Sequence, residues 1–507
     1  MAEPFYITTA ISYPNGRPHI GHAYEAIATD AIARFQRLSG RDVLFTTGTD
    51  EHGLKMAQAA RARAIAPKAL ADEMSSHFRE MDDVLNISYD RFIRTSAPAH
   101  HAASQALWQA MAAAGDLYLG RYEGWYSVRD EAFYDEGELL AGEGDTKLSP
   151  QGAPVEWTVE ESWFFRLSAY ADRLLAHYEA NPRFIRPESR RNEVVSFVRG
   201  GLSDLSVSRT SFDWGVPVPA SDGHVMYVWV DALTNYLTST GYPDDTETYR
   251  RYWPADLHII GKDIVRFHAV YWPAFLMSAG LPLPAQVFGH GFLLNRGEKM
   301  SKSVGNVVDP LAMAQAYGVD QLRYFLLREV SFGQDGSYSH QAIVTRTNAD
   351  LANGLGNLAQ RCLSMIAKSC GGIVPAAGAE PDALKLDALL PRVAAAMEEL
   401  AINRALEIIW EGVAEANRWF AERAPWSLRK TDAAAADGVL YRAAEAVRIL
   451  AILVRWAIPA SADALLDQLR QDTDARGFAA LAKPLVAGTQ LPPPHGIFPR
   501  LLEAEPV

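Results

Sequence analysis

Two short polar segments that lie far apart in the chain contain the side chains best suited to phosphate chemistry. They are His19-Ile20-Gly21-His22 and Lys299-Met300-Ser301-Lys302-Ser303. Imidazole and ammonium groups donate hydrogen bonds to phosphate oxygens, and an ammonium group also neutralises their charge. Together the two segments predict a divided site that holds and reacts the triphosphate of a nucleotide. The alternative is that the histidines are only cap or surface residues and the lysines belong to a solvated loop.

The first segment is expected at the start of a helix that follows a strand. Residues 5–11 form an apolar stretch typical of a buried strand, and apolar residues then recur at helical spacing from Ile20 to Leu38, before Gly40. The free N–H groups and the dipole of a helix N-terminus favour an anion. The second segment lies between Gly297 and Gly305, so we expect a mobile loop that brings its ammonium groups to the phosphates.

Further strands are expected to complete the sheet that positions these residues. Residues 42–47 are apolar and are followed by a polar tip that contains Asp50. A strand, a helix and a second strand imply a right-handed crossover and a parallel sheet, which binds ligands beyond the carboxyl ends of its strands. Residues 226–230 and 256–260 are expected to add strands from later in the chain. His19, His22 and Asp50 should therefore converge at one edge.

The pattern of elements predicts an α/β protein with a helical C-terminal region. A Rossmann-like catalytic domain is expected in two halves, residues 1–114 and 227–292, split by an inserted α+β connective domain at residues 115–226. A linking fold, residues 293–350, carries the lysine loop. Residues 351–507 are rich in Ala, Leu and Arg at helical spacing, which predicts an all-α helix bundle closed by a Pro-rich extended strap.

Composition limits the kinds of partner. The chain has 507 residues and a formal net charge of −13, so any contact with RNA requires a local basic face. No apolar run is long enough to span a membrane and no signal peptide opens the chain, so we expect a cytoplasmic protein with no membrane partner. Cys362 and Cys370 are the two cysteines, too few for a disulfide framework, and they are interpreted as buried small residues.

The two polar segments resemble the two signature motifs of class I aminoacyl-tRNA synthetases, in which both stabilise the transition state as an amino-acid carboxylate attacks the α-phosphate of ATP. Within that class the chain resembles the methionyl-tRNA synthetases over nearly its full length. The matching segments are Ala10-Ile11-Ser12-Tyr13, Thr49-Asp50-Glu51-His52-Gly53, Gly201-Leu202-Ser203-Asp204-Leu205-Ser206-Val207-Ser208-Arg209, Trp214-Gly215-Val216-Pro217-Val218-Pro219, Tyr227-Val228-Trp229-Val230-Asp231-Ala232 and Gly261-Lys262-Asp263-Ile264 through His268.

The resemblance implies a role for individual residues. Positions that match the family's methionine pocket are Ile11, Tyr13, Asp50, Trp229, Ala232, Tyr236, Ile264 and His268, with Asp50 holding the substrate ammonium. Positions implied to bind ATP are His19, Gly21, His22, Gly261, Asp263, Lys299 and Lys302, of which the two histidines and the two lysines are implied to be catalytic.

Several of these residues have a structural alternative. Trp229 is also consistent with a core aromatic residue, and His268 with a histidine satisfied within its helix. Glu25 and Arg209 match a charged pair near the family's active site, or a structural salt bridge. Leu233 stands where some relatives carry proline, so the pocket wall is expected to differ there.

The helical region is implied to read the anticodon. Asn357, Arg361 and Trp426 match the family's anticodon-reading positions, because an unstacked base lies on an indole face while amide and guanidinium groups bind its edge. From local sequence alone, Trp426 is equally consistent with helix packing and Arg361 with a surface charge.

The implied reaction joins L-methionine to methionine tRNA, initiator and elongator, through methionyl-adenylate, with ATP and Mg²⁺. Many relatives carry a zinc-holding cysteine knuckle in the inserted domain, but residues 115–226 contain no cysteine, so we expect no structural zinc. We expect a monomer. The rival interpretations are a class I synthetase for isoleucine, valine, leucine or cysteine, a nucleotidyltransferase that does not use tRNA, and a non-catalytic tRNA-binding protein.

Overall fold

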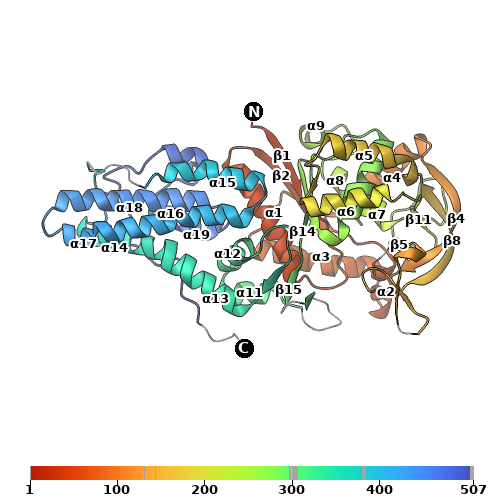
Figure 1. Cartoon of the computed structure of the whole chain (residues 1–507), viewed down its shortest axis with the longest axis horizontal. Coiled ribbons are helices and arrows are strands. Elements are labelled where there is room, and N and C mark those ends of the chain that lie inside the picture. The colour runs from red at the N-terminus through yellow and green to blue at the C-terminus, as the bar shows by residue number, and fades with distance from the viewer. Residues whose placement is uncertain are drawn as a thin grey trace.

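A parallel β-sheet of six strands forms the centre of the computed structural model (Figure 1), which describes residues 2–130, 132–142, 144–295, 298–299, 307–378 and 384–502. The strand order is β3-β2-β1-β13-β14-β9, and every neighbouring pair is parallel. The strands are β1 (Pro4–Thr8), β2 (Asp42–Thr49), β3 (Arg91–Arg94), β9 (Ile185–Arg186), β13 (Leu257–Gly261) and β14 (Val287–His290). The predicted Rossmann-like sheet is confirmed.

Helix α1 (Ile20–Leu38) connects β1 to β2 and lies between the sheet and the helical region. Its apolar side chains are buried, and Phe35 packs its ring against both Trp456 and Phe478 of the C-terminal region. The helix ends at Ser39, after which Gly40 has a φ of 88°, a conformation that glycine adopts without a steric cost. The sequence pattern predicted both ends of this helix.

One expectation about a strand was wrong, and another strand was not anticipated. Residues 226–230 were expected to form a parallel strand, but β12 (Val225–Met226) pairs antiparallel with β11 (Ser208–Arg209), and helix α7 (Val228–Leu233) follows at once. A short apolar run does not distinguish a buried strand from a buried helix. Strand β9 lies inside the range predicted for the insertion, yet it is an edge strand of the main sheet. Its two residues are too few to show a period.

The inserted region contributes an antiparallel sheet at the end of the molecule opposite the helical region (Figure 1). Its order is β10-β8-β4-β5, formed by β4 (Leu117–Ser127), β5 (Ala132–Tyr134), β8 (Glu156–Phe165) and β10 (Leu205–Ser206), and a small hairpin joins β6 (Leu140–Ala141) to β7 (Lys147–Leu148). The helices of the first 280 residues that surround the two sheets are α2 (Leu54–Ala62), α3 (Pro67–Val84), α4 (Pro98–Ala113), α5 (Ala171–Ala180), α6 (Glu188–Arg199), α8 (Asn235–Thr238), α9 (Glu247–Tyr252) and α10 (Trp272–Ala279).

The segment after β14 leads from the sheet to the helical region. It contains β15 (Leu293–Asn295), β16 (Glu298–Lys299), β17 (Gly336–Tyr338), α11 (Pro310–Tyr317), α12 (Val319–Glu329) and α13 (His340–Arg346). Lys299 is in β16, where its backbone pairs with Leu294. Residues 300–306, and with them Lys302, lie outside the described residues.

The C-terminal region is a helix bundle, as predicted (Figure 1). It contains α14 (Asn357–Ser369), α15 (Leu389–Glu398), α16 (Ile402–Arg423), α17 (Pro425–Leu428), α18 (Ala433–Val454) and α19 (Pro459–Gln468). The periodic stretch 389–420 is two helices, because the chain turns at Leu400, whose φ is 54°. Residues 491–499 form no helix or strand, and Leu491 and Phe498 are buried against the bundle. Among the described helices, none combines the length and the apolar character needed to cross a bilayer.

Candidate active site

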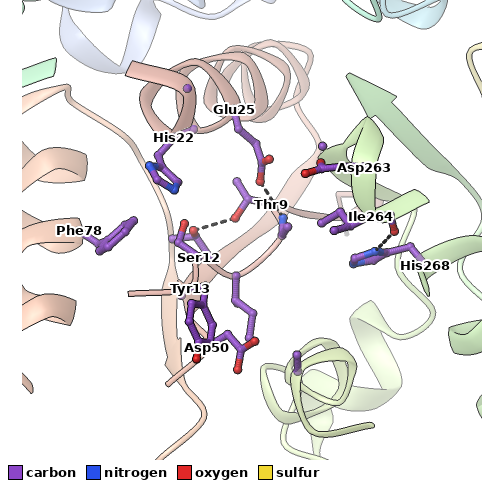
Figure 2. A pocket seen from close by; sticks show the side chains of 18 of the residues that line it. Thr9, Ser12, Tyr13, His22, Glu25, Asp50, Phe78, Asp263, Ile264 and His268 are labelled. Atoms are coloured by element: carbon purple, nitrogen blue, oxygen red, sulfur yellow. Dashed lines mark hydrogen bonds between the residues drawn. The ribbon is translucent and has the colours of Figure 1, made fainter. Parts of the chain in front are cut away.

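A cavity of about 610 Å³ opens at the carboxyl edge of the parallel sheet and collects the predicted site residues. It is lined by the segments that follow β1, β2, β13 and β14, by the start of α1, and by α7 and α8 (Figure 2). The predicted residues that line it are Ile11, Tyr13, His19, Gly21, His22, Asp50, Trp229, Ala232, Tyr236, Gly261, Asp263, Ile264 and His268. Residues from both predicted halves of the catalytic domain therefore share one cavity.

His19 and His22 cap helix α1 and also line the cavity. The N–H of Gly21 donates to Nδ1 of His19 at 3.1 Å, and the N–H of His19 donates to Nδ1 of His22 at 3.1 Å. The two rings lie 3.9 Å apart, and the ring of Phe78 meets His22 edge-on at 5.1 Å. The capping interpretation and the phosphate-binding interpretation are thus compatible, because the caps use only one nitrogen of each ring.

The capping bonds determine which nitrogen of each imidazole carries the proton. Because Nδ1 of His19 and Nδ1 of His22 accept hydrogen bonds, the proton of each neutral ring is on Nε2. Neither cap bond uses the Nε2–H group, and both rings lie at the helix end where the backbone dipole favours an anion. Two such donors from one helix turn suit a phosphate group.

Glu25, one turn further along α1, connects three elements of the site. Its carboxylate accepts from the N–H of Ala10 at 2.9 Å and from Nε2 of His290 at 2.8 Å (Figure 2 shows the first bond). His290 also contacts the carbonyl of Gly291 through Nδ1 at 2.8 Å, so it donates from both nitrogens. Burial opposes the charge, but the Glu25 carboxylate and the Gly291 carbonyl raise the pKa of His290 above its ordinary value.

Tyr236 and His268 form a buried polar pair in the wall made by α8 and η4 (Phe267–Tyr271). His268 donates from Nδ1 to the carbonyl of Ile264 at 3.0 Å, and the hydroxyl of Tyr236 donates to its Nε2 at 2.7 Å. Burial lowers the pKa of His268 to about 4, so the ring is neutral at neutral pH. The hydrogen of the Tyr236 hydroxyl is therefore used within the wall.

Trp229 is part of the cavity wall and is only half-buried. The ring of Phe267 stacks on it at 3.8 Å with an angle of 5° between the planes, and His268 meets it edge-on at 6.2 Å. The indole, with a second ring stacked on one face, therefore adds aromatic surface to the cavity wall. Such a surface suits a thioether, which makes favourable contacts with aromatic rings.

Asp50 lies beside Tyr13, across the cavity from His268 (Figure 2). Its N–H donates to the carbonyl of Ser12 at 2.9 Å, which joins the segment after β2 to the segment after β1. The hydroxyl of Tyr13 accepts from the N–H of Met56 at 3.0 Å. The cavity thus has a carboxylate on one side and stacked aromatic rings on the other.

His290 and Phe267 line the cavity but were not selected from the sequence. His290 is a polar residue at the end of a buried strand, which is the signal that identified Asp50, so the same argument would have found it. Phe267 carries no such signal, because a phenylalanine in an apolar helix is usually core. Glu25 was expected to pair with Arg209; in the structure it binds His290, whereas Arg209 donates to Ser206 and its guanidinium lies over Phe133.

The predicted anticodon residues lie at the bundle. Trp426 in α17 is 43% exposed, and the guanidinium of Arg361 lies 5.0 Å from its ring centre. Asn357 begins α14 one helical turn before Arg361 and is exposed. A stacked, partly exposed indole next to a guanidinium is an arrangement that binds unstacked bases.

Two observations concern metals and thiols. Across the described ranges, no group of three or more histidine, cysteine or acidic side chains is arranged to hold a metal ion. Cys362 and Cys370 are free thiols, and burial raises the pKa of Cys362. Cys362 packs inside the bundle, as expected of a small buried residue, whereas Cys370 is only partly buried and its thiol donates to Asp437 at 3.4 Å.

Comparison with known proteins identifies the class. The family model described as "tRNA synthetases class I (M)" matches residues 5–363, and the one described as "Anticodon binding domain of methionyl tRNA ligase" matches residues 374–506. A divided parallel sheet with paired imidazoles at α1, joined to a helix bundle, is thus the structure of a class I aminoacyl-tRNA synthetase.

Relatives place the chain within that class. It is 63% identical to the methionine–tRNA ligase of Brucella suis over 99% of both chains, and 61% identical to that of Mesorhizobium japonicum over 99% of this chain and 98% of the other. The structure of Mycobacterium tuberculosis methionyl-tRNA synthetase in complex with methionyl-adenylate superposes with a TM-score of 0.96 at 61% identity, covering 98% of this chain and 100% of that one. The chain belongs to the methionyl-tRNA synthetase family.

The neutral state of His268 makes a prediction about pH. In the unfolded chain a histidine titrates near its ordinary pKa of about 6.5, whereas in the fold the pKa of His268 is about 4. Protonation therefore opposes folding increasingly as the pH falls from 6.5 towards 4. Replacing His268 by Gln keeps an acceptor for Tyr236 and removes this penalty, which amounts to about 2 kcal/mol at pH 5.

Thermal unfolding of the wild type and of His268→Gln at pH 7.5 and pH 5 measures the effect. The wild type should lose more stability on acidification than the variant, so the gap between their midpoints should close or reverse. An equal loss in both proteins would show that His268 is not held neutral.

Proposed function

We propose that the chain attaches L-methionine to methionine tRNA in two steps at the cavity beyond the sheet. The first step forms methionyl-adenylate and releases pyrophosphate, and the second transfers methionine to the terminal ribose of the tRNA and releases AMP. One observation carries the proposal: a single cavity of about 610 Å³ is lined by the two imidazoles of α1, by the carboxylate of Asp50 and by the aromatic residues Trp229 and Phe267. Family membership supports methionine over the other amino acids.

In the first step, the methionine carboxylate attacks the α-phosphorus of ATP, and the bond from that phosphorus to the bridging oxygen of pyrophosphate breaks. A carboxylate is already a competent nucleophile, so catalysis consists of positioning and of charge stabilisation. We assign the Nε2–H donors of His19 and His22, with Lys299 and Lys302, to the phosphates. Lys302 lies outside the described residues and keeps its role from the motif alone.

The remainder of the nucleotide is assigned to the segment after β13. Gly261 ends this strand, and Asp263 follows it within the cavity. A carboxylate at a strand end accepts hydrogen bonds from ribose hydroxyls. The charged pair of Glu25 and His290 lies behind this position and connects α1 to the ends of β1 and β14. We propose that it sets the distance between the ribose and phosphate positions.

The substrate methionine is assigned to the space between Asp50 and the aromatic wall. Asp50 would bind its ammonium group by a charge-assisted bond, and Trp229 would contact its thioether. The rest of the pocket is assigned to Ile11, Tyr13, Ala232, Tyr236, Ile264 and His268. Leucine and isoleucine lack the polarisable sulfur, so selection rests on shape and on this aromatic contact.

The bundle is assigned to the tRNA. We propose that residues 351–507 act as the anticodon-binding unit for initiator and elongator tRNA, with Asn357, Arg361 and Trp426 contacting anticodon bases. The exposed indole beside a guanidinium supports this role. We also propose that the protein acts as a cytoplasmic monomer.

We also propose which metal ions the protein requires. Mg²⁺ prefers phosphate oxygens and water, and we propose that it enters bound to the triphosphate of ATP, where it would neutralise phosphate charge. We assign it no protein ligand, because the described residues offer no cluster for one. We propose no structural zinc, on the ground that residues 115–226 contain no cysteine.

The exchange of labelled pyrophosphate into ATP, measured with each of the twenty amino acids, tests the first step. Only L-methionine should support exchange at low concentration, and the protein should then charge methionine tRNA. Exchange with another amino acid in preference to methionine, or exchange without any charging of tRNA, would contradict the proposal.

Replacing Lys302 by Ala should slow adenylate formation about a hundredfold or more, because one donor to the transition-state phosphates is removed. Methionine affinity, measured by tryptophan fluorescence, should change less than about twofold, since the lysine is not assigned to the amino acid. Lys483→Ala, an exposed lysine of the C-terminal region, is the matched control and should leave both unchanged. Equal losses of rate and of methionine affinity would argue against a transition-state role.

Replacing Trp426 by Ala should lower kcat/KM for tRNA charging about tenfold or more, because stacking on an aromatic ring contributes about 1–3 kcal/mol per base. Pyrophosphate exchange in the absence of tRNA should stay within about twofold of wild type, since the bundle is remote from the cavity. A parallel fall in both activities would point to a packing role for Trp426.

A further inference from the structure

A buried carboxylate next to the cavity binds two histidines from other elements. Asp231 in α7 is fully buried, and its two oxygens lie 2.6 Å from Nδ1 of His52 and 2.6 Å from Nε2 of His100. His52 belongs to the segment after β2, and His100 to α4. We call Asp231, His52 and His100 the Asp231 clamp.

Hydrogen-bond geometry identifies the protons of the clamp. The hydroxyl of Thr238 donates to the carbonyl of Thr234 at 3.0 Å, so its oxygen is the acceptor in the 2.9 Å contact with Nδ1 of His100. His100 then donates from both nitrogens and is positively charged. The charges of His100 and Asp231 compensate one another inside the protein, which makes burial of the carboxylate tolerable. Burial opposes ionisation of Asp231, but the two histidines hold its pKa well below its usual range.

The clamp connects two segments that line the cavity. Asp231 stands between Trp229 and Ala232, which line the cavity from α7, and His52 stands two residues after Asp50, which lines it from the segment after β2. Both oxygens of Asp231 are occupied, so this carboxylate does not compete with Asp50 for a cation. The His52 bond therefore joins the segment of Asp50 to that of Trp229, and the His100 bond fixes α7 against α4.

We propose that Asp231, His52 and His100 are positioning residues that set the separation between the ammonium-binding carboxylate and the thioether-binding wall. Methionine spans both with one flexible chain, and it binds well only if the two contacts form together. A misplacement of about 1 Å in such a site can cost about a hundredfold in rate. The inference rests on the proposed function, since it assigns the two walls to the two ends of methionine.

Three variants test the clamp in the pyrophosphate-exchange reaction. Asp231→Ala removes the shared acceptor and His52→Ala removes one donor, so each should raise KM for methionine about tenfold or more while KM for ATP stays within about twofold. In His52→Asn the amide nitrogen lies where Nδ1 of histidine lies, so it restores the donor. Its KM for methionine should return to within about threefold of wild type.

Controls separate positioning from general loss of structure. Thermal unfolding shows which variants fold, and His177→Ala, which removes a partly buried histidine of α5, should leave both KM values unchanged. If Asp231→Ala does not fold, the inference is tested by comparing the KM for methionine of His52→Ala with that of His52→Asn. The inference is overturned if folded His52→Ala keeps its KM for methionine, if the KM values for methionine and ATP rise together, or if asparagine does not rescue.

The outcome also distinguishes the clamp from the proposed function. Wild-type protein that shows no methionine-dependent exchange refutes the proposed function itself. Wild-type protein that exchanges with methionine, together with an unchanged His52→Ala variant, refutes only the clamp.

Discussion

The buried ion pair of Asp30 and Arg323 holds helix α1 in place, and the reactive end of the site depends on that helix. Asp30 lies in α1 and Arg323 in α12; both side chains are fully buried, and their charged atoms are 2.6 Å apart. Arg323 also donates to the carbonyls of Leu85 and Ala457, which belong to the catalytic region and the bundle. Removing one partner of such a pair typically costs about 3–5 kcal/mol, since the other charge stays buried.

Polar groups near the N-terminus of α1 form the reactive part of the site, and the ion pair fixes where they lie. Glu25 joins the helix to Ala10 and His290, and the cap bonds of His19 and His22 leave the proton of each neutral ring on Nε2. Histidines elsewhere in the site differ in charge, because their surroundings differ. His268 is neutral in a buried wall, whereas His290 donates from both nitrogens and the Glu25 carboxylate raises its pKa. Histidine side chains thus supply hydrogen-bond donors at the start of α1, an acceptor for Tyr236 at His268, and a partner that balances the Glu25 carboxylate at His290.

Prediction from the sequence succeeded where periodicity was long or where a motif followed a strand. The helix at residues 20–38, the strands around residues 5, 42 and 257, and the helix bundle all show repeats that local packing enforces. It failed for residues 226–230, although the equally short run at residues 256–260 was predicted correctly, because a short apolar run does not by itself distinguish a strand from a buried helix. It did not anticipate β9, whose two residues show no period. Phe267 and the Asp231 clamp gave no signal, because the role of each comes from its contacts.

The sequence by itself determined the class of chemistry, since the spacing of His19 and His22 at a helix start and the lysine segment specify groups for a triphosphate. It also determined which residues face the core, because hydrophobic burial acts on local periodicity. Only the tertiary structure decided how residues from positions 11 to 268 share one cavity, which nitrogen of each histidine carries a proton, and which carboxylates are neutralised. Those properties depend on distances between segments remote in sequence, and hydrogen bonds and charges act only over such short distances.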